Sequence, residues 1–213
     1  GSYLLDKFDN EENPFRFKQH YIFNALESEV LYDLLDIMNG NCNAEIKLFS
    51  NNMKKIKTYK VLPLKIYVST YYGRRYVLAW NYIFKCFAFY RLDRIKEVCK
   101  SNECTNKNEM MMRADTTVQK LWGVSFGKEN YIEKLEMTVR IAKDEEYILK
   151  RLEREKRNGT IQKLANGDYK FMTEVYDASE MVPWIKTFTG RIVEIKCSNE
   201  RVEKQIKEDF EMM

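Results

Sequence analysis

The sequence predicts an α+β protein with a helix at the front, a small all-β unit in the middle and a mixed unit of helices and strands at the end. Three observations lead to this prediction. Apolar residues recur at three- and four-residue spacing up to residue 38, alternate with a period of two from residue 44, and switch between both periods after residue 133. The hydrophobic content of 45% and the charged content of 32% exclude collagen-like and wholly disordered classes.

The front helix is predicted over about 15–38, where the apolar residues share one face and Gly40 follows as a stop signal. We treat residues 1–43 as a linker region, 44–127 as the first domain and 128–213 as the second. Gly1-Ser2 resembles a remnant of cloning, so we expect the chain to be a fragment of a longer protein.

Four strands are predicted in the first domain, near 45–50, 58–68, 74–82 and 85–92. They are rich in β-branched and aromatic residues, and short polar breaks separate them. Several short strands with tight turns favour a small barrel or sandwich. Ten aromatic residues lie between positions 67 and 90, too many for all of them to be buried in so small a barrel.

Residues 101–112, including Met110, Met111 and Met112, are expected to form a loop, after which Asp115 and Thr116 cap a short helix. The second domain then follows a βαββαβ order with one further helix. Split βαβ units of this kind form a ferredoxin-like α/β sandwich. The expected elements are a strand at 133–141, a helix at 144–157, strands at 161–164 and 169–175 around the turn Asn166-Gly167-Asp168, a helix at 179–188, a strand at 191–197 and a helix from 199.

The net charge of +4 is distributed unevenly along the chain. Residues 46–100 hold 13 Lys or Arg and only two acids, which gives +11, whereas residues 1–45 carry −6 and residues 101–213 carry −1. A basic block of this size favours an anionic partner, with nucleic acid as the first candidate. The alternative is a solvated face of a lysine-rich protein.

The composition argues against most catalytic chemistries. His20 is the single histidine, so a catalytic triad or a histidine-ligated metal site has little to build on. The chain has no P-loop and no GxSxG motif. The five cysteines show no CxxC spacing, which indicates free thiols in a reducing cytoplasm. We therefore expect no enzyme activity, no cofactor, no metal and no membrane-spanning segment.

Three motifs follow one another between residues 63 and 95. Pro63-Leu64 begins a strand, a glycine turn leads into Arg74-Arg75-Tyr76-Val77, and Phe89-Tyr90-Arg91-Leu92-Asp93-Arg94-Ile95 closes the segment. Together they resemble the WYL domain of bacterial transcriptional regulators, and the closing RLDRI is the most specific part. Downstream, Ser125-Phe126-Gly127 resembles the turn that leaves this domain, and Pro183-Trp184-Ile185 is similar to its C-terminal extension, called WCX. Two positions depart from the family pattern, since Trp-Tyr-Leu reads Arg75-Tyr76-Val77 and Phe49 stands where a tyrosine is frequent.

The resemblance implies a small Sm-like (SH3-like) barrel whose basic pocket binds an anionic ligand, either single-stranded nucleic acid or a nucleotide. It also implies a homodimer with contacts through the WCX domain. The ligand would modulate an upstream winged helix-turn-helix domain, which binds promoter DNA in this family. A second reading stays open, in which the chain is an accessory nucleic-acid-binding module attached to or assisting an effector enzyme.

The resemblance also implies the ligand-binding residues. Arginine binds phosphate through a planar fork, and aromatic rings stack bases at about 1–3 kcal/mol each. The candidates, in order, are Arg91 and Arg94, then Tyr76 and Ser50, then Arg74 and Arg75 at the rim.

Alternatives remain open for the principal candidates. Arg91 and Arg94 face opposite sides of a regular strand, so both reach one pocket only if the chain bends near Asp93. Arg94 has a salt bridge with Asp93 or Glu97 as its structural alternative, and Arg91 has a carboxylate elsewhere. Tyr76 is equally suited to be a core tyrosine with a satisfied hydroxyl.

Overall fold

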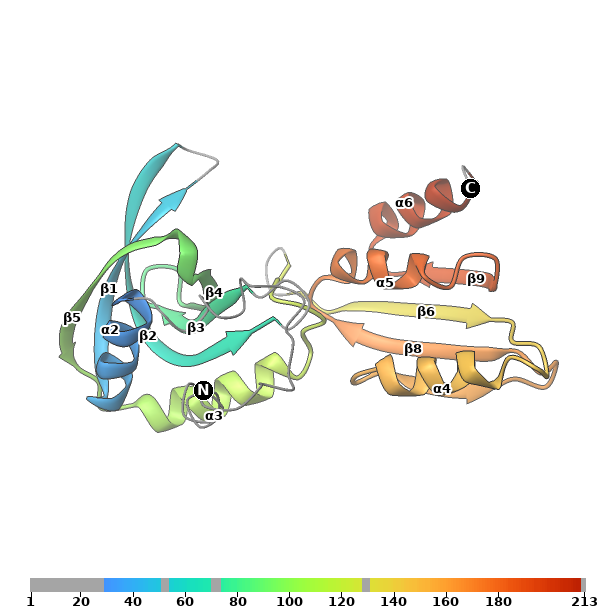
Figure 1. Ribbon diagram of the computed structural model, residues 1–213, viewed down its shortest axis with the longest axis horizontal. Helices are drawn as coiled ribbons and strands as arrows, with labels where there is room; N and C mark the ends of the chain where they lie inside the picture. The colour runs from blue at the N-terminus through green and yellow to red at the C-terminus, as the bar shows by residue number, and fades with distance from the viewer. Residues whose placement is uncertain (1–28, 51–53, 70–73, 128–130, 212–213) are drawn as a thin grey trace, which may run out of the picture. The chain divides into compact units, whose positions relative to one another are not determined.

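The computed structural model describes residues 29–50, 54–69, 74–127 and 131–211. The chain is a mixed α+β protein with two antiparallel sheets, and it divides into two compact units between Met111 and Met112 (Figure 1). The boundary falls within helix α3 (Lys107–Val118).

The first unit is built on a five-stranded antiparallel sheet with the order β4-β3-β2-β1-β5. Strands β4 and β5 lie at opposite edges, yet only the three-residue 3₁₀ turn η2 (Leu92–Arg94) joins them, so the sheet must curl to bring its edges toward each other. Among the described residues no ladder joins β4 to β5, and the sheet is therefore open. The strands are β1 (Cys42–Ser50), β2 (Lys55–Val68), β3 (Arg75–Asn81), β4 (Cys86–Arg91) and β5 (Ile95–Glu103).

Helix α2 (Glu29–Asn39) packs on one face of this sheet. Its buried residues Leu31, Leu34 and Ile37 occur at helical spacing and share a core cluster with residues from the strands, among them Ile46 and Val77. The helix confirms the second half of the predicted segment, and residues 15–28 lie outside the described residues. The left-handed residue after the helix is Asn41, with φ 52°, and not Gly40.

The expected loop at 101–112 is wrong. Strand β5 continues to Glu103, and α3 begins at Lys107. Most side chains of β5 are exposed, so the strand is held by its backbone ladder with β1 and not by an apolar face, which removes the alternation that the sequence analysis relied on.

The helix α3 also overturns the expected cap. Asp115 and Thr116 lie inside it, and the Thr116 hydroxyl donates to the carbonyl of Met112 at 3.1 Å. Met110 belongs to the helix and is buried. The three methionines therefore belong to regular structure.

The second unit has a four-stranded antiparallel sheet with the order β7-β8-β6-β9. The predicted βαββαβ order with a final helix is confirmed, although the expected helix at 179–188 is split into a 3₁₀ turn and a short α-helix. The elements are β6 (Glu133–Val139), α4 (Glu146–Glu155), β7 (Thr160–Lys163), β8 (Tyr169–Val175), η3 (Ala178–Met181), α5 (Val182–Lys186), β9 (Ile192–Cys197) and α6 (Glu200–Glu211).

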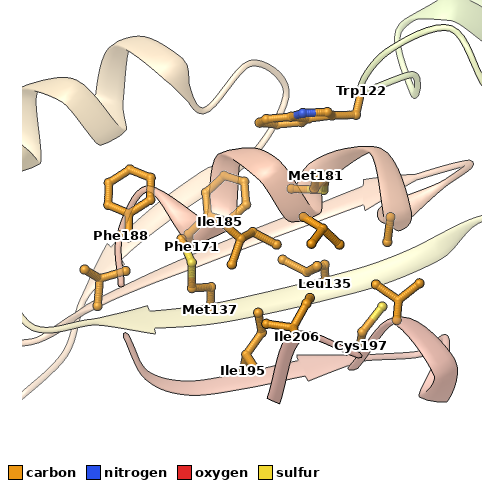
Figure 2. Close-up of a cluster of buried hydrophobic side chains, with 14 of the residues drawn as sticks. Trp122, Leu135, Met137, Phe171, Met181, Ile185, Phe188, Ile195, Cys197 and Ile206 are labelled. Atoms are coloured by element: carbon orange, nitrogen blue, oxygen red, sulfur yellow. The ribbon is translucent and has the colours of Figure 1, made fainter. Parts of the chain in front are cut away.

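One face of this sheet carries the core of the second unit. Leu135, Met137 and Phe171 alternate along β6 and β8 and are fully buried, together with Met181 and Ile185 (Figure 2). The opposite face is charged and held by ion pairs between neighbouring strands, such as Lys170 with Glu136 at 2.7 Å. This division between an apolar and a polar face is typical of an antiparallel sheet that is covered on one side.

Candidate ligand-binding site

Strand pairing in the first unit brings Tyr76 and Arg91 together. Tyr76 lies directly opposite Arg91 on β4 and directly opposite Tyr67 on β2. Because directly opposite residues of a sheet project from the same face, the three side chains form a row across three strands. Sequence analysis had selected Tyr76 and Arg91 separately, by motif.

Phe89 fixes the aromatic part of this row. Its ring packs edge-on against Tyr67 at 5.2 Å and against Tyr76 at 6.3 Å between ring centroids. Tyr76 is buried, which agrees with its alternative reading as a core tyrosine. Its ring is therefore shielded from solvent, whereas the side chain of Arg91 is 25% exposed and accessible to a ligand.

The guanidinium of Arg91 is held by a carboxylate. Its Nε donates to Oδ1 of Asp93 at 3.0 Å, and its second nitrogen donates to Oδ2. The hydrogen bond from Arg91 lowers the pKa of Asp93, and the positive charges of Arg91, Arg94 and Arg74 lower it further. Asp93 is therefore ionised at neutral pH, bound by Arg91 and within the field of Arg94 and Arg74.

The 3₁₀ turn η2 supplies the bend that two arginines at odd spacing require. Arg91 closes β4, and Arg94 is the last residue of the turn. The salt bridge that was considered for Arg94 is made by Arg91 instead, since Asp93 lies within the turn and its carboxylate meets the end of the preceding strand. Arg91 and Arg94 thus share one anionic neighbour, and their convergence on one ligand stays a prediction.

Two of the remaining candidates, Arg74 and Arg75, adjoin Tyr76, whereas Ser50 pairs with Lys55 at the beginning of β2. Arg74 is exposed and immediately precedes β3, and Arg75 is the half-buried first residue of that strand, opposite Val68. Ser50 is the last residue of β1. It lies two positions beyond Leu48, whose partner Ile95 begins β5, so the end of β1 runs toward the η2 turn.

Sequence analysis missed two residues of this arrangement. Asp93 was treated only as a structural partner, and Tyr67 only as one of many aromatics. The alternation of β2, β3 and β4 was sufficient to place Tyr67 in the same row, once the register was known. The register itself depends on a bulge between Pro63 and Lys65, which the sequence does not mark.

The second unit contains a shallow cavity of about 490 Å³ beside the polar face of its sheet. Lys120 and Lys134 line it, but both pair with Glu174, at 3.5 and 3.4 Å. Glu136 also lines the cavity, so two lysines face two glutamates and the formal charges balance, which makes it a weaker anion site than the arginine cluster of the first unit.

The described residues contain no group of three or more His, Cys, Asp or Glu side chains placed to hold a metal ion. All five cysteines are free thiols. Within the same residues, no helix combines the length and the apolar character that crossing a bilayer requires.

Comparisons with known proteins give a fold and no family. No family model matches the sequence, and no curated protein matches it. Among solved structures, one similar chain is Proteasome accessory factor B/C (PafBC) of Arthrobacter aurescens, with a TM-score of 0.40 and 11% identity over 93% of this chain and 28% of that one. Another is described as a CRISPR Cas-related protein, with a TM-score of 0.55 and 10% identity over 86% of this chain and 51% of that one. The chain therefore spans about half the length of the CRISPR Cas-related protein and less than a third of PafBC. It shares an overall fold with the CRISPR Cas-related protein.

Proposed function

We propose that this chain is the ligand-sensing and dimerising part of a WYL-type transcriptional regulator of the bacterial cytoplasm. The observation that supports the proposal best is the cluster at the η2 turn, where Arg91 binds Asp93 next to the Tyr67–Tyr76 row and the charges of Arg94 and Arg74 also act on this carboxylate. A cluster with more arginines than carboxylates retains a net positive charge, which attracts an anionic ligand.

The fold supports the finer assignment of both units. Five antiparallel strands with the edges joined by a 3₁₀ turn are compatible with an Sm-like (SH3-like) barrel, which we propose for the WYL domain. The element order and strand order of the second unit are compatible with a ferredoxin-like WCX domain, to which we assign the homodimer contacts. We propose no catalytic role for either unit.

The proposed ligand is single-stranded nucleic acid or a nucleotide. The planar guanidinium of Arg91 fits two phosphate oxygens in the same way as it now fits the two carboxylate oxygens of Asp93. Binding would release Arg91 from Asp93 and reorganise the η2 turn. A ligand that prefers one arrangement of this turn increases the population of that arrangement. In a dimer, this would change how the attached DNA-binding domains are arranged.

Binding to a labelled oligothymidylate by fluorescence anisotropy tests this proposal. At low salt we expect measurable affinity, a steep loss of affinity with added salt, and a loss of at least about tenfold in an Arg91→Ala/Arg94→Ala variant. The matched control is Lys150→Ala/Lys204→Ala, which removes two exposed charges from α4 and α6 of the second unit. Absence of binding, or equal binding by both double variants, would contradict the proposal.

The second candidate is an accessory nucleic-acid-binding module that assists an effector enzyme. It is favoured by the fold similarity to a protein described as CRISPR Cas-related. Both candidates use the same arginine cluster, so they differ in what the rest of the protein contains. The full-length sequence separates them, because an upstream winged helix-turn-helix supports the regulator and a helicase or nuclease domain supports the module.

A further inference from the structure

The turn between β3 and β4 presents three large apolar side chains to solvent. Tyr82 is 37% exposed, Ile83 is 58% exposed and Phe84 is 65% exposed. Three consecutive residues of this kind gain little from folding while they remain in water, so their exposure indicates a binding surface. The surface lies at the opposite end of β3 and β4 from Tyr76 and Arg91.

Hydrogen bonds hold this turn in one conformation. The side chain of Asn81, which is only 1% exposed, accepts from the backbone N–H groups of Ile83 at 2.8 Å and Phe84 at 2.9 Å, and it donates to the Tyr90 hydroxyl at 2.7 Å. The Tyr82 hydroxyl donates to Asn43 on β1 at 2.9 Å. A surface that is already ordered binds with a small loss of conformational entropy.

The rings themselves are oriented by their neighbours. Phe84 lies 6.3 Å from Tyr59 between ring centroids, and Tyr59 lies 5.7 Å from Tyr90, which is buried. Phe84 is therefore connected to the buried Tyr90 through its contact with Tyr59. More than half of its surface remains available for an additional planar group.

The charge around the turn identifies the chemistry of the partner. From residue 46 to residue 92 the chain carries ten Lys or Arg and no Asp or Glu. Lys85 is exposed in the turn itself, and Lys60 is hydrogen-bonded through its backbone carbonyl to the N–H of Tyr82. Glu45 is the acid that pairs with Lys60, at 3.5 Å. An aromatic surface beside the exposed cation Lys85, in a segment of the chain without acids, suits a polyanion with exposed planar groups.

We propose that the Tyr82–Lys85 turn is a second contact for single-stranded nucleic acid, in which a base stacks on Phe84 and a neighbouring phosphate binds Lys85. This inference rests on the proposed function in one respect, because both name nucleic acid as the ligand. Tyr82 follows Tyr76 by six residue steps, a span of about 20 Å, so a single strand of several nucleotides contacts both ends whereas a mononucleotide contacts one.

The experiment compares Phe84 variants of the 213-residue chain on an oligothymidylate of about eight nucleotides, on a duplex of the same length and on the mononucleotide dTMP. We expect Phe84→Ala to weaken binding of the single strand at least about fivefold, the effect of losing one stacked base. Binding of the duplex and of dTMP is expected to stay unchanged, because neither offers an unpaired base to both ends of the hairpin.

Two further substitutions separate stacking from apolar docking and from loss of fold. Phe84→Leu keeps an apolar side chain without a π-face and is expected to bind as weakly as Phe84→Ala, whereas Phe84→Trp is expected to restore binding. The matched control is Tyr32→Ala, which removes a 75% exposed aromatic ring from α2, beside acidic Asp33 and Asp36. Full binding by Phe84→Leu, or equal binding by every variant, would overturn the inference. The exposed turn would then be better explained as a contact for a protein partner.

The result is distinguishable from failure of the proposed function. If Arg91→Ala/Arg94→Ala abolishes dTMP binding while Phe84→Ala leaves the oligonucleotide affinity unchanged, the arginine site stands and the second contact falls. If the arginine variant has no effect on dTMP or on the oligonucleotide while Phe84→Ala still weakens the latter, the turn stands and the arginine site falls.

Discussion

Arg91 and Asp93 are joined by two hydrogen bonds between the planar guanidinium of the one and both carboxylate oxygens of the other. This is the geometry in which arginine binds a phosphate group. A ligand at Arg91 therefore meets a competitor that belongs to the protein, two residues away along the chain. The competitor is ionised, because Arg91 holds the pKa of Asp93 below its usual range.

Removing this competitor is expected to strengthen ligand binding. In Asp93→Asn the side chain keeps its size but loses its charge, so Arg91 is released and one repulsive charge disappears. We expect the affinity for oligothymidylate to rise by about two- to tenfold, a modest gain because Asp93 is largely exposed and its ion pair is correspondingly weak. Fluorescence anisotropy at fixed ionic strength measures the change.

The control for this change is Glu97→Gln. It also removes one carboxylate from the first unit, but Glu97 pairs with Lys47 of β1 at 2.8 Å and forms no ion pair with an arginine among the described residues. We expect it to alter affinity much less than Asp93→Asn. If Asp93→Asn instead weakens binding as far as Arg91→Ala does, Asp93 orients Arg91 for the ligand and does not compete with it.

Asn81 is expected to be a major determinant of the stability of the first unit. Its buried amide makes three hydrogen bonds, two to the turn backbone and one to the Tyr90 hydroxyl. Asn81→Ala leaves these groups without their partner, which costs about 2–3 kcal/mol in the free energy of unfolding. Urea denaturation measures this. A loss no larger than that of Tyr90→Phe would show that the two backbone bonds contribute nothing.

Tyr90 is expected to make stability depend on alkaline pH. Burial raises the pKa of Tyr90 from 10.0 to about 12. The folded state thus favours the neutral phenol, so its contribution is fully present below pH 10 and is lost as the pH rises from about 10 to 12. We expect the unfolding free energy of the wild type to fall more steeply over this range than that of Tyr90→Phe. Parallel curves for the two proteins would contradict the assignment.

Elements with a clear local pattern were predicted well. The alternating strand that contains Leu135 and Met137 and the turn Asn166-Gly167-Asp168 are both confirmed, because their residues satisfy local rules of alternation and turn conformation. Strand β5 was missed since its side chains are mostly exposed and its pairing partner β1 lies some fifty residues earlier, as in the pair of Lys47 with Glu97. A strand specified by a distant partner leaves no local signal.

The candidate site shows the same limit. The motif around Arg91 and Asp93 was visible in the sequence, but the row of Tyr67, Tyr76 and Arg91 follows from the register of three strands. The choice of Arg91 over Arg94 as the partner of Asp93 follows from the 3₁₀ turn, which sets the direction of each side chain at a bend. Neither the register nor the bend is determined by residues that are adjacent in the chain.

Two glycines of the second unit are expected to respond differently to alanine. A Cβ at Gly159 would lie 2.2 Å from the ring of Phe171, which is fully buried, and 3.0 Å from the carbonyl oxygen of Lys156, so neither neighbour can move away freely. Gly159→Ala is therefore expected to cost about 3 kcal/mol through overpacking. Gly167 has φ 90° but open space around it, so Gly167→Ala is expected to cost only about 1 kcal/mol of backbone strain. Thermal unfolding of the two variants measures the difference. If Gly167→Ala were the more damaging of the two, backbone conformation and not the close approach to Phe171 would govern this part of the sheet, and the packing of Gly159 against Phe171 would carry little of its stability.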